Sequence, residues 1–237
     1  MLKPILEYGT KLMNDKIVVK KIISDSEFIV YVEDLRTNLV LKQISFEEDL
    51  TRWIRLPPHS NIVSIFDTFE HVDGDKQYKF SLTEMSNHGD MYKFIQSLNL
   101  KLDITIPLSY MEVIYDCMIQ LTLAMEFAHN NGLCHGNFSL SNVALSKDGD
   151  TIIYKIKNFA PGSSIKLPVT DKWSFTRGRK NVKEAEKIEI IMLKDIYSLG
   201  ICLLELMIGR FSSKKFSISL DSLPLTWAEY QESTPLI

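Results

Sequence analysis

The sequence has 237 residues, of which 45% are hydrophobic, 24% charged and 10% aromatic, so it can bury a sizeable core in one large domain or two packed lobes. This composition excludes intrinsic disorder as the main state. The net charge of −3 gives no overall attraction toward nucleic acid or an anionic membrane, so neither is expected as a partner.

No segment predicts export or membrane insertion. Charges and a proline interrupt residues 1–11 before any apolar stretch reaches the length of a signal peptide, and the longest apolar run, Leu199 to Ile208, is too short to span a bilayer. The cysteines are odd in number and lie within apolar runs, as is typical of buried thiols in a reducing compartment; they are Cys117, Cys134 and Cys202. A cytoplasmic or nuclear protein is expected.

The first third of the sequence predicts a small β-rich unit. Short β-branched and aromatic runs alternate with polar turns, and no glycine lies between Gly9 and Gly74. The runs expected to form strands are Ile17 to Ile23, Glu27 to Val32, Asn38 to Ile44, Ile62 to Phe69 and Tyr78 to Glu84.

One helix is expected among these strands. Ser45 is followed three residues later by Glu48, which is the spacing of a capping box and predicts a helix that starts at Ser45. Pro57 and Pro58 would end this helix after Leu56.

Beyond these strands the periodicity becomes helical. Apolar residues at helical spacing predict a helix from Tyr110 to Asn130 with one buried face. A β-hairpin that turns near Gly149 is expected over Asn142 to Ile156, followed by a loop-rich segment over residues 158–183. A second helix, roughly Leu193 to Gly209, is apolar on almost every side and is therefore expected to be a central, fully packed element.

Four sequence patterns occur in the order that they have in eukaryotic protein kinases. They are a strand ending in a lysine, a His-Ser-Asn-Ile-Val segment, a His-Gly-Asn-Phe-Ser-Leu-Ser-Asn segment and an Asp-Ile-Tyr-Ser-Leu-Gly segment, at Leu39 to Lys42, His59 to Val63, His135 to Asn142 and Asp195 to Gly200. Over about residues 16–210 the chain therefore resembles this family. The resemblance implies an α+β, two-lobed protein-kinase-like fold with a small β-rich N-lobe and a mainly helical C-lobe.

The resemblance also implies a division of the chain. Residues 1–84 would form the N-lobe and residues 85–237 the C-lobe, together one kinase-like domain over residues 16–237. The residues after Arg210 are too few for the three helices that end the larger lobe in the family. The C-lobe is therefore expected to be shortened at its C-terminus.

A nucleotide cleft between the lobes follows from the resemblance. Lys42 takes the position of the strand lysine that contacts phosphates, and Asp49 or Glu48 is expected to pair with it. Val40 and Ala144 would lie above and below an adenine ring. The hinge residues expected beside the ligand are Thr83, Glu84 and Ser86.

The catalytic positions depart from the family pattern. Asn137 stands where the base aspartate is expected, and loss of a positioned general base costs on the order of 10²–10⁴ in rate. Ser139 stands where a lysine would contact the γ-phosphate. Asn142 keeps one metal position, but Asn158 replaces the aspartate that holds magnesium, a cation that usually binds one or two carboxylates.

The loop that would cover the phosphates has no glycine. Ser24, Ser26 and Ile29 take the glycine positions, so backbone amides approach phosphates less freely. Asp25 and Glu27 add negative charge where a triphosphate would lie. The resemblance implies ATP and Mg as cofactors, and these departures argue against both.

Positions that support the fold are better kept. The resemblance implies that His135, Phe159, Ile65 and Trp53 stack as an apolar column between the lobes. Asp195 would accept hydrogen bonds from the backbone around His135. We interpret His135 as a buried structural residue and not as a catalyst.

The leading hypothesis is a pseudokinase that lacks efficient phosphoryl transfer and acts by binding another protein, either an active kinase or its substrate; residual ATP binding stays open. Two alternatives remain. One is a divergent, active Ser/Thr protein kinase that uses Lys42 and Asn142 with a carboxylate from Asp25 or Glu27. The other is a truncated, non-functional kinase fragment.

Overall fold

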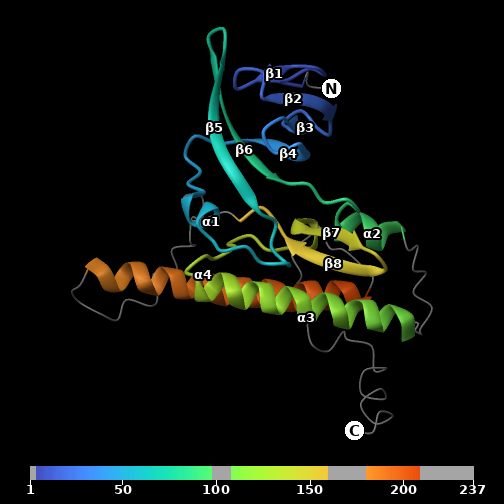
Figure 1. Ribbon diagram of the computed structural model, residues 1–237. Coiled ribbons are helices and arrows are strands. Elements are labelled where there is room, and N and C mark those ends of the chain that lie inside the picture. Colours follow the sequence, from blue (N-terminus) through green and yellow to red (C-terminus); the bar gives the residue numbers. More distant parts are fainter. Residues whose placement is uncertain (1–3, 98–107, 160–179, 209–237) are drawn as a thin grey trace, which may run out of the picture.

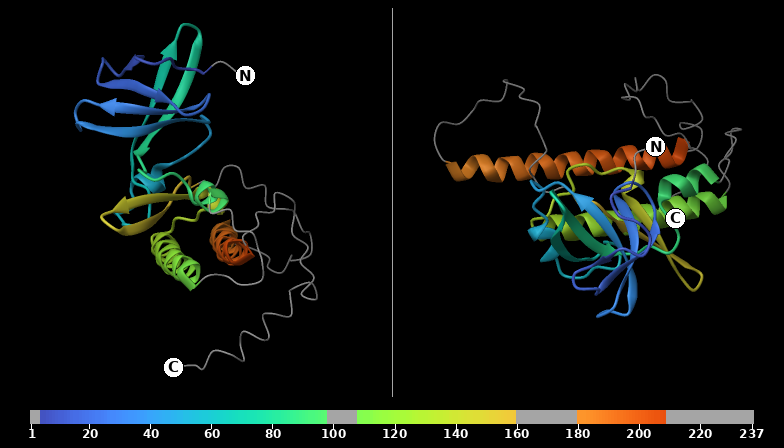
Figure 2. Two further views of the ribbon diagram at one scale, coloured as in Figure 1. Left: turned by 90° about the vertical axis from the view of Figure 1, so that its right-hand side faces the viewer. Right: turned by 90° about the horizontal axis from the view of Figure 1, so that it is seen from above.

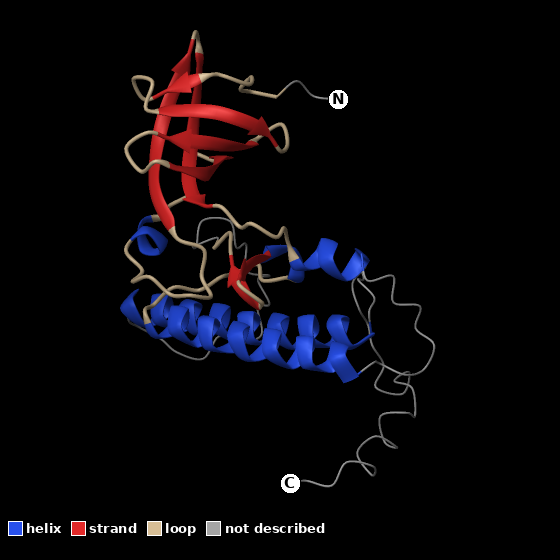
Figure 3. Ribbon diagram, turned by 45° about the vertical axis from the view of Figure 1, so that its right-hand side comes forward, coloured by secondary structure: helices blue, strands red, loops and turns tan. Residues whose placement is uncertain are grey.

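The structure is a computed structural model that describes residues 4–97, 108–159 and 180–208. Figure 1 shows a β-sheet standing above a helical base, with a small hairpin and a short helix between the two. The same separation of strands from helices is visible in Figure 3, where the sheet is red and the two long helices are blue.

The upper part is a six-stranded antiparallel sheet with the order β1-β2-β3-β4-β6-β5. Alternate residues of its strands face a shared core that includes Val19, Phe28, Val30, Leu41 and Phe80, as expected for half-buried strands. All five predicted strands are confirmed, with shifts of a few residues at their ends. The strands are β1 Lys11–Leu12, β2 Ile17–Ile22, β3 Glu27–Val32, β4 Thr37–Ile44, β5 Ile65–Asp73 and β6 Lys76–Glu84.

The helix expected from Ser45 to Leu56 is wrong in extent, because only α1, Thr51–Ile54, is helical. Glu48 N donates to the carbonyl of Ser45 at 3.1 Å, which closes a turn. The hydroxyl of Ser45 accepts from Glu47 N at 3.3 Å instead of from Glu48 N, so only the reciprocal bond of the capping box forms, from Ser45 N to Glu48 Oε1 at 3.5 Å. Asp49 Oδ1 accepts from Thr51 N at 3.0 Å, and this competing acceptor delays the helix.

Two long helices form the base of the molecule and pack side by side, as the end-on view in Figure 2 shows. They are α3, Leu108–Asn130, and α4, Lys180–Ile208. The prediction for α3 is confirmed, since Ile114, Cys117 and Leu121 are buried on one face. The predicted hairpin is confirmed too. The smaller elements are α2 Met91–Ser97, a 3₁₀ turn at Leu140–Asn142, β7 Val143–Asp148 and β8 Thr151–Ile156.

The prediction that the last helix is fully packed is wrong. Helix α4 buries Asp195 and Leu199, but Leu193 and Tyr197 are 60% and 69% exposed. Among the described residues, α3 covers only one side of α4. The helix also starts at Lys180, within the segment expected as a loop; the rest of that segment and the expected C-terminal shortening lie outside the described residues.

The β-hairpin β7–β8 joins the sheet to the helices. Val63 N donates to the carbonyl of Ile156 at 2.9 Å, and the buried Asn61 donates through Nδ2 to the carbonyl of Tyr154 at 3.0 Å. The cysteines are free, with Cys117 and Cys202 buried, as expected. In the described part of the chain, no helix has the length and hydrophobicity needed to cross a membrane.

Candidate functional site

A cleft of about 670 Å³ lies between the lower edge of the sheet and the β7–β8 hairpin. Its volume is within the range of small-molecule sites. Most of the residues predicted from the sequence as site residues line this cleft: Val40, Lys42, Thr83, Glu84, Ser86, Asn137, Asn142, Ala144 and Asn158. Asp49 and Ser139 are not among the lining residues, and Ser139 Oγ instead lies 2.8 Å from Ser141 Oγ.

The predicted apolar column is present beside the cleft, and two of its members, Trp53 and Phe159, form part of the cleft wall. The ring of Phe159 contacts those of Trp53 and His135, with centroids 5.5 Å and 5.0 Å apart. Ile65 is buried in the same core as Trp53 and Phe159. The column therefore connects α1, the loop that starts at His135 and the residues that follow β8.

Asp195 anchors the loop that starts at His135, as predicted. Its two carboxylate oxygens accept from His135 N and Gly136 N, each at 2.7 Å. His129 Nε2 also lies 3.1 Å from Asp195 Oδ2, a contact that the sequence did not suggest. Charge-assisted bonds of this length are among the stronger hydrogen bonds in proteins, so the loop is held firmly from α4.

His135 is a structural residue. Its ring is fully buried, Nδ1 accepts from Asn137 N at 3.2 Å, and Nε2 donates to the carbonyl of Lys157 at 3.0 Å. Burial lowers the pKa of this imidazole, because removal from water disfavours the charged form. The neutral ring satisfies both partners, which agrees with the interpretation from the sequence.

Lys42 does not pair with an acid, so the expected pairing with Asp49 or Glu48 is wrong. Its ammonium donates to Asn158 Oδ1 at 3.0 Å, and it has no ion pair with the described residues. Asp49 is exposed, and its bonds to Thr51 lower its pKa. Because α1 begins only at Thr51, the two acids precede the helix and are not directed from it toward the lysine.

The hydrogen bond from Lys42 continues into a chain of amides. Asn158 Nδ2 donates to Asn142 Oδ1 at 3.0 Å, and Asn142 Nδ2 donates to the carbonyl of Asn137 at 2.9 Å. Asn158 has a φ of 60°, a left-handed conformation that asparagine tolerates better than most residues. We call Lys42, Asn158, Asn142 and Asn137 the amide chain. All four polar atoms of its two middle side chains already have protein partners.

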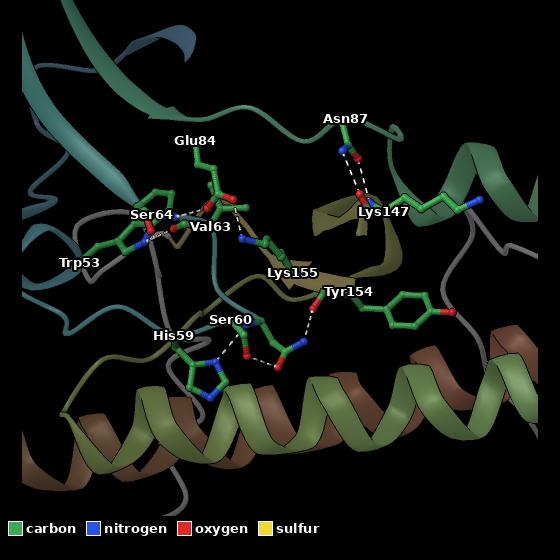
Figure 4. A network of polar contacts seen from close by, with 11 residues as sticks. Trp53, His59, Ser60, Val63, Ser64, Glu84, Asn87, Lys147, Tyr154 and Lys155 are labelled. Atoms are coloured by element: carbon green, nitrogen blue, oxygen red, sulfur yellow. Dashed lines mark hydrogen bonds and ion pairs between the residues drawn. The ribbon is translucent and has the colours of Figure 1, made fainter. Parts of the chain in front are cut away.

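Glu84, the last residue of β6, lines the cleft with both carboxylate oxygens already paired. Figure 4 shows its carboxylate directed toward Lys155 of β8, with which it forms an ion pair, while its other oxygen accepts from Ser64 N at 3.2 Å. Farther along, Asn87 and Lys147 exchange two hydrogen bonds, of 3.1 Å and 2.8 Å. Sequence reasoning missed Lys155, which is 71 residues from its partner and stands in no motif.

Comparisons with known proteins agree with this fold. No protein-family model matches the chain. The PknI kinase domain of Mycobacterium tuberculosis shares the fold, with a TM-score of 0.58 and 17% identity over 86% of this chain and 79% of that one. The serine/threonine-protein kinase ksp1 of Schizosaccharomyces pombe is 24% identical over 212 residues, or 86% of this chain and 41% of ksp1.

The chain has a protein-kinase-like fold and is similar in sequence to serine/threonine-protein kinases. Serine/threonine-protein kinase PLK4 of Xenopus tropicalis is a further relative, 27% identical over 159 residues, which are 64% of this chain and 15% of PLK4. The chain thus spans less than half the length of these curated relatives. The α+β, kinase-like fold predicted from the sequence is confirmed.

A magnesium ion held in the manner of the family does not fit the residues at this site. Both metal positions are asparagines, and each amide oxygen already accepts a hydrogen bond, from Lys42 or from Asn158. Amide groups also bring no formal charge to a hard dication. Among the described residues, no group of three or more histidine, cysteine, aspartate or glutamate side chains is placed to bind a metal ion.

Proposed function

We propose that this chain is a pseudokinase, a kinase-like domain that transfers phosphoryl groups inefficiently and acts by binding another protein. The observation that carries the proposal is the amide chain. In it, hydrogen bonds to neutral amide groups join the strand lysine, the position of the metal aspartate and the second metal position.

Phosphoryl transfer depends on positioning and on charge stabilisation. Here Asn137 lines the cleft at the position of the general base, and an amide cannot take up the hydroxyl proton. Lys42 has an amide partner in place of an acid, so the lysine is oriented without the carboxylate that the family uses. Catalytic groups that act together are not additive in their effects on rate. The catalytic groups that remain here therefore contribute little once the others have been replaced.

A phosphotransfer assay tests the enzymatic half of the proposal. The full chain is incubated with radiolabelled ATP, magnesium or manganese, and casein or myelin basic protein. We expect incorporation equal to that of Lys42→Met. Lys76→Met is the matched control, because Lys76 is an exposed residue of β6 and does not line the cleft. Turnover by the wild type and Lys76→Met that Lys42→Met abolishes would overturn the proposal in favour of an active kinase.

The protein-binding half is supported by what the chain retains. The apolar column and the Asp195 anchor are intact although the chemical positions are not, so a folded surface remains. The partner class that we propose is an active kinase or its substrate. Cross-linking in cells followed by reconstitution with the purified candidate tests this, and a stoichiometric complex with neither class of protein would contradict it.

A further inference from the structure

The charges that line the cleft are balanced without a ligand. Two of the lining carboxylates have partners, since Glu84 pairs with Lys155 and Asp90 lies 3.6 Å from the ammonium of Lys93. The remaining charged side chains that line the cleft are two acids and two lysines: Glu27, Glu48, Lys42 and Lys157. A site with balanced charge complements a neutral ligand better than a triphosphate.

The turn between β2 and β3 offers few amides to an anion. Ile23 N and Ser24 N both donate to the carbonyl of Glu27, at 2.9 Å and 3.0 Å, and Ser26 N donates to Ser24 Oγ at 3.4 Å. Anion sites in loops depend on several backbone N–H groups that converge on the ligand. In this turn most of those groups are used to close the turn itself.

Negative charge lies beside Lys42, the lysine of the sheet that lines the cleft. Glu27 is the cross-strand partner of Lys42 in the β3–β4 pairing, and both side chains line the cleft. Directly opposite residues on one face of a sheet are close neighbours. A phosphate near Lys42 would therefore also meet the carboxylate of Glu27.

The other end of the cleft suits a flat, uncharged ring. Val40 and Ala144 line it from opposite sides, and Met85 and Ser86 follow β6 along its edge. Among the described residues, no backbone hydrogen bond involves Met85 or Ser86. Their N–H and C=O groups are therefore available to orient a heterocycle.

We infer that the cleft binds an uncharged heterocycle of nucleoside size, needs no divalent metal, and discriminates against magnesium nucleoside triphosphates. The inference rests on the proposed function through the amide chain, which has asparagines at both metal positions. It does not depend on the protein partner. It assigns a class of ligand that differs in charge from the nucleotide expected from the family resemblance.

Calorimetric titration of the full chain with adenosine, AMP and ATP tests the inference, each in magnesium chloride and in EDTA. We expect adenosine to bind about tenfold or more tightly than ATP, with AMP between them, because each added phosphate brings charge toward Glu27. None of the three affinities should depend on magnesium. Tighter binding of ATP than of adenosine, a loss of ATP binding in EDTA, or no binding of adenosine would overturn the inference.

Variants of residues that line the cleft test which side chains determine the affinities for ATP and adenosine. Glu27→Gln should raise the affinity for ATP by about three- to tenfold and leave that for adenosine unchanged. Glu33→Gln is the control, since Glu33 is exposed just beyond the end of β3 and does not line the cleft. Ala144→Phe fills the cleft and should abolish adenosine binding while the circular dichroism spectrum is retained. Unchanged ATP affinity in Glu27→Gln, or adenosine binding that survives Ala144→Phe, would contradict the assignment.

The two proposals fail separately. Tight magnesium-dependent binding of ATP without turnover would overturn the ligand assignment and leave the pseudokinase proposal standing. Turnover that depends on Lys42 would overturn the pseudokinase proposal whatever the affinity for adenosine.

Discussion

Two sets of residues alternate along the same loops and have different surroundings. His135 and Phe159 are buried in the apolar column, where Phe159 also forms part of the cleft wall, whereas Asn137 and Asn158, two residues and one residue away, are more exposed and line the cleft with polar groups. The buried set has the contacts that the family fold requires. The cleft set has neutral amides where the chemistry requires charge. Support of the fold and catalysis are therefore separable even between adjacent residues.

The physical reason is that the two sets are constrained differently. Replacing a buried ring leaves a cavity that its neighbours cannot close completely. An asparagine has nearly the shape of an aspartate and can satisfy its neighbours by hydrogen bonds, as Asn158 does with Lys42 and Asn142. A loss of charge at the cleft therefore leaves the packing of the column unchanged.

Substitution of Asp195 is expected to have the largest effect on the free energy of unfolding. Asp195→Ala removes both acceptors of His135 N and Gly136 N and leaves two amides unpaired, so we expect a loss of about 3–5 kcal/mol in the free energy of unfolding. Urea denaturation followed by circular dichroism measures it. Asp116→Ala is the control, since the exposed Asp116 bonds, among the described residues, only to Gln120 on its own helix and should cost less than about 1 kcal/mol. Equal losses in the two variants would contradict the anchoring role.

Phe159 and Asn158 are adjacent in the chain, so substitutions at these two positions compare the buried set with the cleft set most directly. Phe159→Ala deletes a ring that is 2% exposed, and we expect it to cost about 3 kcal/mol or more. Asn158→Ala removes two part-buried hydrogen bonds at the cleft and should cost about 1 kcal/mol. Urea midpoints of the two variants compare them. If Asn158→Ala were the more destabilising, the amide chain would be part of the structural support and the separation proposed here would be wrong.

The buried imidazole predicts a dependence of stability on pH. Because burial lowers the pKa of His135 in the folded state, the unfolded chain binds a proton more readily, and stability is lost as the pH falls below the unfolded value of about 6.5. Burial lowers the pKa of His59 in the same direction. We expect a loss of about 1 kcal/mol from His135 for each pH unit below that value, and a smaller loss from His59 because water screens its partly exposed ring.

Urea denaturation between neutral pH and mildly acidic pH measures this slope. His135→Phe keeps a buried ring but removes the titrating group, so its stability should fall less steeply even though its stability at neutral pH is lower. His88→Asn is the control, because His88 is exposed. The same slope in all three proteins would show that His135 does not contribute.

Most of the elements and contacts that support the fold could be predicted from the sequence, because they follow from local residue patterns or from the order of the family motifs. Strand alternation located β2 to β6, helical spacing located α3, and the order of the motifs brought Asp195 to His135. The failures concern choices between competing partners. The capping-box pattern at Ser45 could not reveal that Asp49 would accept from Thr51, and this changed the surroundings of Lys42.

The cleft was predicted less completely for the same reason. The residues that line it follow from the motifs, but their pairing does not. Lys42 meets Asn158 across 116 residues, and Glu84 meets Lys155 across 71. Such pairs depend on how the hairpin sits against the sheet, which single-sequence patterns do not contain. The roles of the lining residues in binding a nucleotide remain predictions.

Substitutions on the outer face of α4 are expected to have the smallest effect on the free energy of unfolding, because this face lies outside the buried set. The sequence predicted a fully packed helix, but Leu193 is 60% exposed while Leu206, on the inner face, is fully buried. Leu193→Lys should change the free energy of unfolding by no more than about 0.5 kcal/mol, whereas Leu206→Ala leaves a cavity and should cost about 2–4 kcal/mol. Urea denaturation of both variants checks this. A loss of several kcal/mol in Leu193→Lys would show that the outer face is packed in solution. The whole helix would then belong to the buried set, as its apolar composition predicts.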